Sequence, residues 1–291
     1  MLFSSLTPNQ YELWKSFWEK TRNRTADCTF FNLYGWALAY GIEYAVENDL
    51  FWVRSTKGEK PVYWYPLGNT DDLNWDTVLA DFPSGSCFER IPISLAEQIQ
   101  SRCPRIVNFS PTRDQDEYLY ERTALADFTG RKLHKKRSHL NAYERLYGTD
   151  FRPLSKKDIP SILALSEEWL LLQEPQNPSL KSEYTAIERM LSLWDLDDSV
   201  CCGGLFVEGK LIAYDFGSAM DDKTFVIHIE KGLPQYRGVY PSIVKNFAGH
   251  SIPPTYETIN REQDLGEEGL RHSKMTYQPS GFLQKACFSL S

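Results

Sequence analysis

The chain lacks a long apolar segment, and its overall charge is not basic. No run of about 18 apolar residues occurs in the sequence, so we expect no transmembrane segment. The opening residues, MLFSSLTPNQ, lack a basic region followed by an apolar core, so we expect no secretory signal. The formal net charge of −7 argues against a broad surface for duplex DNA, which would be basic. These absences favour a cytoplasmic protein that does not bind duplex DNA.

The cysteines show no metal-ligand spacing. Cys201 and Cys202 are adjacent, but neither belongs to a Cys-x-x-Cys pair. Reduced thiols that pack as small apolar side chains are the expected state in the cytosol. We therefore expect no metal site and no tightly bound cofactor. The six cysteines are Cys28, Cys87, Cys103, Cys201, Cys202 and Cys287.

A short internal echo divides the chain near its middle. The sequence FSSLT at 3–7 returns as FRPLS at 151–155, and a helical pattern follows each copy. Ser155 and Asp158 form a capping box, and Thr7 with Pro8 predicts a second helix start. With 291 residues, the chain is long enough for two domains, which we place at 1–148 and 149–291.

Alternating apolar residues predict strands in both halves. In the first half they predict neighbouring strands at 50–54 and 61–68. In the second half the order is typical of an α/β layered domain with mixed sheets flanked by helices. We expect strands at 202–208, 210–219, 224–230 and 255–259, and helices at 240–249 and 264–273.

The strand at 224–230 runs into a turn and then a helix, and this corner is a candidate anion site. Gly238 permits backbone angles that other residues resist. The helix that follows directs its free N–H groups and the positive end of its dipole toward the turn. Such a terminus binds phosphate well. An ordinary strand-to-helix turn is the alternative interpretation.

The segment GRKLHKKRSHLNAYERLY at 130–147 predicts a basic helix with an apolar stripe. Lys136 projects onto that stripe, and Arg137 lies on its flank. A cation on a packed face needs a carboxylate or a bound anion. Either Lys136 reaches water or a structural acid, or both residues contact phosphates of a ligand.

Two resemblances carry the functional prediction. DFRPLSKKDIPSILALSEEW and HIEKGLPQYRGVYPSIV resemble the first strand and helix, and the donor loop, of GNAT acyltransferases. Gln235 and Gly238 match the loop pattern, whereas Tyr240 stands at its last small position. GRKLHKKRSHLNAYERLYG and INREQDLGEEGLRHSKMTYQP resemble the phosphatidylglycerol lysyltransferase C-terminal-domain family, a tandem pair of GNAT folds similar to Fem-type aminoacyltransferases.

The resemblance implies acyl transfer from a phosphate-bearing donor, either an acyl-coenzyme A or an aminoacyl-tRNA, to an amine or hydroxyl acceptor. The second domain would bind the donor, and the first would shape the acceptor cleft. The donor phosphates would lie on the amides of the turn, and Asn260 would supply a further donor-binding amide. The donor-binding residues are then Gln235, Arg237, Gly238, Val239, Tyr240 and Asn260.

Glu230 is the candidate general base, because it lies on the polar face of the strand that ends at the donor loop. A salt bridge to Lys231 or Arg271 is the competing interpretation. Tyr277 is a candidate proton donor to the leaving group. Asp215, on the preceding strand, is a weaker acid–base candidate.

Arg271 and Lys274 adjoin on one helical face and are candidate substrate-binding cations together with Lys136 and Arg137. A solvated pair is the alternative for Arg271 and Lys274. Asp264 is expected to cap their helix.

Three functional classes remain open. The first is a soluble acyltransferase with either donor, and the second modifies a lipid headgroup at a membrane surface. The third is a non-catalytic binding module whose donor loop is altered at Tyr240. The acceptor and the oligomeric state are not predicted.

Overall fold

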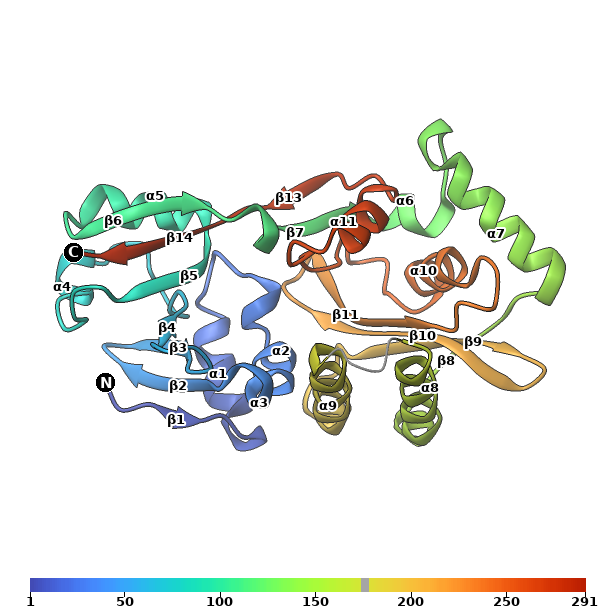
Figure 1. Cartoon of the computed structure of the whole chain (residues 1–291), viewed down its shortest axis with the longest axis horizontal. Coiled ribbons are helices and arrows are strands. Elements are labelled where there is room, and N and C mark those ends of the chain that lie inside the picture. Colours follow the sequence, from blue (N-terminus) through green and yellow to red (C-terminus); the bar gives the residue numbers. More distant parts are fainter. Residues whose placement is uncertain (174–177) are drawn as a thin grey trace. The chain divides into compact units, whose positions relative to one another are not determined.

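The computed structural model describes residues 1–173 and 178–291, and the chain divides into two compact units. The first unit comprises Met1–Glu117 and Leu283–Ser291, and the second comprises Tyr118–Phe282. Each unit is built on a seven-stranded mixed sheet with flanking helices (Figure 1). The predicted α/β class with two mixed sheets is therefore confirmed.

The sheet of the first unit has the order β1-β2-β3-β4-β5-β14-β6. Its strands are β1 (Ser4–Ser5), β2 (Ile42–Glu47), β3 (Leu50–Ser55), β4 (Val62–Tyr63), β5 (Cys87–Pro92), β6 (Ile106–Pro111) and β14 (Lys285–Leu290). Its helices are α1 (Tyr11–Trp18), α2 (Phe30–Gly35), α3 (Ala37–Tyr40), α4 (Trp75–Val78) and α5 (Ile93–Arg102). The two strands predicted at 50–54 and 61–68 correspond to β3 and β4, which pair as neighbours.

The sheet of the second unit has the order β13-β7-β12-β11-β10-β9-β8. Its strands are β7 (Glu117–Glu121), β8 (Asp150–Pro153), β9 (Cys201–Val207), β10 (Lys210–Ala219), β11 (Thr224–Gly232), β12 (Thr258–Asn260) and β13 (Gly281–Leu283). Its helices are α6 (Arg122–Asp127), α7 (His134–Tyr147), α8 (Ile159–Leu171), α9 (Pro178–Ser192), α10 (Val239–His250) and α11 (Glu268–Met275). Helices α8 and α9 cover one face, and α10 covers the other with α7 beside it (Figure 1).

The two sheets follow one plan. Each begins with an edge strand, β1 or β8, and continues through three antiparallel pairs to one parallel pair, β4 with β5 and β11 with β12. A capping box follows each edge strand, formed by Thr7 with Gln10 and by Ser155 with Asp158. The short echo in the sequence therefore marks the same corner of two similar sheets, as expected.

The division between the units lies at Glu117/Tyr118, whereas the sequence placed it at 148/149. The reason is an exchange of strands beside the parallel pairs. Strand β7 pairs antiparallel with β12 of the second unit, so residues 118–148 pack there. The C-terminal strand β14 pairs with β5 and β6 of the first unit. A short motif cannot reveal this exchange, because strand pairing depends on contacts that are distant in sequence.

A β-bulge changes the direction of the side chains along β11. Phe216 pairs with Ile229 and Gly217 pairs with Ile227, so His228 is the extra residue. Beyond the bulge the alternation shifts by one, and Glu230 comes onto the face that Phe225 and Ile227 occupy. The sequence had placed Glu230 on the opposite face, because a uniform alternation was assumed.

Two boundaries near the C-terminus also differ from prediction. The strand expected at 255–259 is β12, and the helix expected at 264–273 is α11, which begins at Glu268. The prediction that Asp264 caps this helix is wrong, since Glu267 is the N-cap. The Asp264 carboxylate instead accepts hydrogen bonds from the Gly266 N–H, the Tyr118 hydroxyl and the Arg271 guanidinium.

A buried ionic cluster fastens β14 inside the first unit. The Lys285 ammonium contacts Asp27 and lies 2.7 Å from a Glu117 oxygen, and all three side chains are almost completely buried. Arg90 pairs with the other oxygen of Asp27. Glu117 also accepts the backbone N–H of Ala26 at 2.9 Å. The cluster therefore joins β14 to residues early in the chain.

We expect Lys285→Met to lower the free energy of unfolding by about 3–5 kcal/mol, because it leaves two buried carboxylates short of a cation. Urea titration followed by tryptophan fluorescence measures this change. Lys223→Met is the control, since it removes a lysine whose pair with Glu257 is exposed. Equal effects of the two substitutions would show that the buried cluster does not stabilise the unit.

Candidate active site

Glu230, the predicted base, forms an ion pair with Arg261. Arg261 Nη2 donates to Glu230 Oε2 at 2.6 Å, and the two side chains are 8% and 17% exposed, so solvent screens the pair weakly. Neither partner expected from the sequence is used. Lys231 binds Glu183 on α9 at 2.7 Å, and Arg271 binds Asp264 at 2.8 Å. Lys231 follows Glu230 directly, and adjacent strand residues point to opposite faces of a sheet.

Lys136 on α7 reaches the same cluster from the apolar stripe of its helix. Its Nζ lies 3.6 Å from the centroid of the Tyr277 ring, and the Arg261 guanidinium carbon lies 4.4 Å from that centroid. Burial, together with the nearby positive charge of Arg261, lowers the pKa of Lys136 to about 8 against the attraction of Glu230. An amine near this pKa exchanges protons close to neutral pH.

Tyr277, the predicted proton donor, lies under these cations with 2% of its surface exposed. Burial raises the pKa of its phenol, so the hydroxyl keeps its proton at neutral pH. The structure thus brings Glu230, Lys136 and Tyr277 together around Arg261, a residue that sequence reasoning missed. We call these four residues the Arg261 cluster.

Asp215 lies behind Glu230. The two residues are direct partners in the ladder between β10 and β11, which places their Cβ atoms about 5 Å apart. Asp215 is fully buried, and among the described residues neither of its carboxyl oxygens has a hydrogen-bond partner. Burial raises its pKa well above the usual value, and Glu230 raises it further. Two carboxyl groups therefore face each other across the ladder between β10 and β11.

The turn before α10 has the predicted backbone. Gly238 is the N-cap of α10 with φ = +85°, a left-handed conformation. Gln235 and Arg237 are exposed. The Val239 N–H donates to the carbonyl of Tyr236 at 3.0 Å, so this amide already has a partner. Donor binding at the turn stays a prediction.

Helix α7 covers the turn from one side. A Cβ atom added to Gly238 would lie 2.2 Å from the carbonyl oxygen of His139. The Tyr147 ring packs edge-on against Tyr236 of the turn, with ring centroids 5.4 Å apart. The glycine is therefore required for the close approach of α7, whatever the turn binds.

Tyr240 is turned toward the sheet and α8. Its hydroxyl donates to the carbonyl of Gly232 at 3.0 Å and accepts the indole N–H of Trp169 at 3.2 Å. The bulky residue in the family's small position is thus accommodated by hydrogen bonds inside the second unit.

The other predicted binding residues have protein partners in the structure. Asn260 is buried, and its side-chain oxygen accepts the Glu262 N–H at 2.8 Å. Arg137 donates to the carbonyls of Phe128 and Gly130. Both side chains therefore form hydrogen bonds with backbone groups of the protein. Their roles in ligand binding stay predictions.

Lys274 is buried rather than solvated. Its ammonium donates to the carbonyl of Arg261, and burial together with the charge of Arg261 lowers its pKa to about 8. This contact holds the backbone on which the Arg261 side chain is mounted. Arg271 fixes the same connection through Asp264, whose pKa is about 2 because hydrogen bonds from Arg271 and Tyr118 outweigh its burial.

A hydrogen-bonded chain on β10, β11 and the segment after β12 was also missed. Ser218 Oγ lies 2.9 Å from His228 Nε2, and His228 Nδ1 lies 3.0 Å from Glu262 Oε1. Ser218 and the His228 ring are almost completely buried. The bulge at His228 creates this chain, and a sequence pattern gives no direct signal of a bulge.

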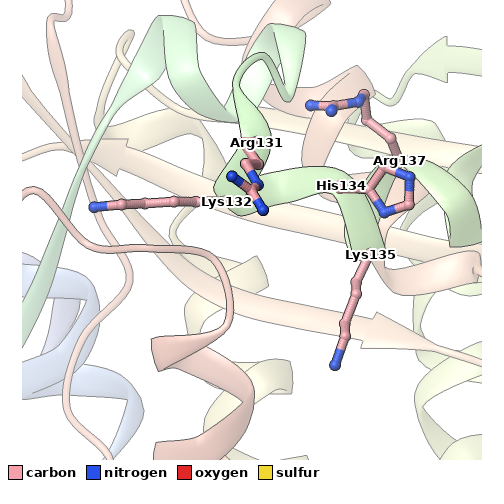
Figure 2. A pocket seen from close by; sticks show the side chains of 5 residues that line it. All are labelled: Arg131, Lys132, His134, Lys135 and Arg137. Carbon is pink, nitrogen blue, oxygen red and sulfur yellow. The ribbon is translucent and has the colours of Figure 1, made fainter.

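A basic hollow of about 590 Å³ lies at the start of α7 (Figure 2). The described residues that line it are all basic: Arg131, Lys132, His134, Lys135 and Arg137. Figure 2 shows Lys132 and Lys135 extending in different directions from this helix start. Six of the seven residues at 131–137 are basic, a density that could have indicated an anion site from the sequence.

Within the described residues, no helix combines the length and apolar character needed to cross a bilayer. In the same ranges, no group of three or more His, Cys, Asp or Glu side chains is arranged to hold a metal ion.

The two similar mixed sheets with their flanking helices form a tandem GNAT-like fold, and family and fold together link the chain to acyl and aminoacyl transferases. Residues 19–286 match the family described as phosphatidylglycerol lysyltransferase, C-terminal. This match covers well over half of the sequence, so the chain belongs to that family.

Solved structures share the fold across the whole chain. A conserved protein of unknown function from Bacteroides thetaiotaomicron has a TM-score of 0.87 and 29% identity, covering 99% of both chains. L-PGS from Bacillus licheniformis has a TM-score of 0.65 and 16% identity, over 96% of this chain and 91% of that one. FemX has a TM-score of 0.60 and 10% identity, over 100% and 98%.

An uncharacterized protein of Mycoplasmoides gallisepticum is 23% identical over 170 residues, which cover 58% of this chain. The match spans about half (54%) of the length of this curated relative.

We expect Gly238→Ala to destabilise the second unit more than Gly209→Ala. Both glycines have positive φ (+85° and +81°), so both substitutions strain the backbone by about 1–2 kcal/mol. Only at Gly238 would the new methyl group meet a backbone carbonyl, and nothing lies within 4 Å at Gly209. Thermal unfolding of the two variants measures the difference. Equal melting temperatures would refute the close packing of α7.

Competitive labelling with acetic anhydride at a series of pH values measures the pKa of Lys136. We expect a midpoint near pH 8, as its lowered pKa requires. Lys223 is the internal control, because its pKa is raised by Glu257. Arg261→Gln should raise the Lys136 midpoint, since it removes a repelling charge and releases Glu230. An unchanged midpoint in that variant would separate Lys136 from the Arg261 cluster.

Proposed function

We propose that this chain transfers an aminoacyl group from an aminoacyl-tRNA to an amine or hydroxyl acceptor. The observation that carries the proposal is that α7 joins two features of the second unit. The basic hollow lies at the start of the helix, and Lys136, on the same helix, reaches the Arg261 cluster. A charged polymer bound at the first would have its reactive end near the second.

The hollow has the chemistry of a phosphate site. Four of its lining side chains are arginine or lysine, and none is acidic. The helix dipole adds positive potential at the N-terminus of α7. The rest of the chain is acidic overall, with a net charge of −7, which suits a local contact with a tRNA end better than a long duplex.

The Arg261 cluster has the groups that acyl transfer needs. The nitrogen or oxygen atom of the acceptor attacks the carbonyl carbon of the aminoacyl ester. The Glu230 carboxylate takes the proton that this atom loses. The positive charges of Arg261 and Lys136 stabilise the negative charge that develops on the carbonyl oxygen. Arg261 Nη1 has no hydrogen-bond partner among the described residues, so it can serve this oxygen. The bond between the acyl carbon and the ribose oxygen then breaks, and the Tyr277 hydroxyl gives its proton to that oxygen.

Coenzyme A is the competing donor, and the turn before α10 is where it would bind. There the Val239 amide is already bonded to Tyr236, and α7 lies close above Gly238. These contacts favour the tRNA donor. For the acceptor, family membership brings phosphatidylglycerol into consideration beside soluble amines, and the experiment distinguishes them.

Transfer of a radiolabelled amino acid from charged tRNA tests the proposal directly. The acceptors are phosphatidylglycerol vesicles, phosphatidylcholine vesicles and a soluble primary amine, and acetyl-coenzyme A replaces the tRNA in a parallel series. We expect label from the tRNA to reach one acceptor class. Acetyl transfer without aminoacyl transfer would refute the tRNA donor, and no transfer with either would favour the binding module.

Binding of tRNA tests the basic hollow separately. We expect the double variant Lys132→Gln/Lys135→Gln to weaken tRNA binding at least roughly tenfold and to reduce the salt slope by about 2, because two phosphate contacts are lost. The matched control is Lys156→Gln/Lys210→Gln, which removes the same charge from exposed ion pairs with Asp195 and Glu168. Fluorescence anisotropy at several salt concentrations measures both. Equal weakening in the two double variants would mean that only net charge matters.

A further inference from the structure

The Asp215 carboxyl group is the feature of the second unit that the proposed chemistry does not use. It is fully buried on β10, directly opposite Glu230 on β11. Among the described residues, neither of its oxygens has a hydrogen-bond partner. A buried polar group without a partner is costly, and a buried charge without one is far more costly. Such a group is retained only where the site gains something from it.

The surroundings of Asp215 decide which charge state it takes. Glu230 and Arg261 are the charged groups that act on it, and they act in opposite directions. Arg261 is already bound to Glu230 at 2.6 Å. Cys202 on β9 and Tyr277 also couple to Asp215, and burial keeps both of these in their neutral, protonated forms. Arg261, the cation that acts on Asp215, is therefore already paired with the Glu230 carboxylate.

We propose that Asp215 is the positioning residue of the Arg261 cluster: a carboxylic acid that keeps its proton, so that Arg261 binds Glu230 alone and Glu230 remains the ionised proton acceptor. The inference rests on the proposed role of Glu230 in acyl transfer. An ionised Asp215 would place two negative charges opposite each other and would compete for the Arg261 guanidinium. Facing carboxyl groups with separated proton affinities are a recurring arrangement in acid–base sites.

In the alternative, Asp215 is ionised and forms a second ion pair with Arg261, beside the pair between Arg261 and Glu230. In that case both carboxylates would share Arg261, and Glu230 would be a weaker base. The two alternatives differ in the protonation of one residue at neutral pH, which is measurable without any substrate.

Carbon NMR of the whole chain, labelled with ¹³C at the aspartate carboxyl carbons, tests the proton directly. We expect one aspartate resonance to stay at the position of a protonated acid at neutral pH and to disappear in Asp215→Asn. Asp264, with a pKa of about 2, is the internal control that remains ionised. If every aspartate is ionised at neutral pH, the proposal is wrong. The wild-type spectrum alone decides this point should the variant fail to fold.

The pH dependence of stability gives a second readout that needs no substrate. Because the folded-state pKa of Asp215 lies above its unfolded value of about 3.9, its contribution to stability is complete below that pH and is lost as pH rises toward the folded pKa. Asp215→Asn removes this loss. The melting temperature of the variant relative to wild type should therefore increase as the pH rises above about 4. A constant difference would overturn the proposal.

The rate of aminoacyl transfer tests the effect on Glu230. The Lys136→Arg substitution removes the titration of Lys136 from the pH profile. In this background, rates normalised to their maximum should fall at high pH as Asp215 ionises. Asp215→Asn in that background should move this fall to higher pH, whereas a purely structural role would change the rate without changing its pH profile. An unmoved profile overturns the positioning role. If no donor supports transfer, the proposed function fails, and the NMR result still decides whether Asp215 holds its proton.

Discussion

The ion pair between Arg261 and Glu230 is the interaction around which the candidate site is organised. At 2.6 Å and mostly out of solvent, it holds a carboxylate and a guanidinium in one geometry. Its neighbours then acquire their properties from it. The charge of Arg261 contributes to the lowered pKa of Lys136 and of Lys274, and the charge of Glu230 contributes to the raised pKa of Asp215. Removing either partner would leave a buried charge uncompensated.

The fold supports this pair through two local devices. The bulge at His228 turns Glu230 toward α7 and α10, and Lys274 with Asp264 fastens the segment that carries Arg261. Both devices lie in the second unit, where β11 and β12 run parallel. The first unit repeats the sheet plan, and its buried charges are those of the cluster around Lys285. Similar sheets thus carry different buried charges.

The family and the fold connect this chain with aminoacyltransferases, and the second unit offers a physical reason for that connection. A single helix, α7, carries cations at its start and one half-buried lysine, Lys136, on its packed face. That lysine was recognised from helical periodicity alone, because a cation on an apolar stripe is conspicuous. Arg261 was not, since its partner is 31 residues away along the chain and no periodic pattern relates the two.

Local patterns were sufficient wherever short-range physics decides the structure. They predicted β9, β10, β11 and α10, the capping box of Ser155 with Asp158, and the glycine before α10, since alternation, caps and turn residues act within a few positions. The tertiary structure decided the exchange of β7 and β14 between the sheets, the face that Glu230 occupies, and the partners of Asp264 and Lys274. These features depend on strand pairing and on burial of charge, which are set only when distant segments meet.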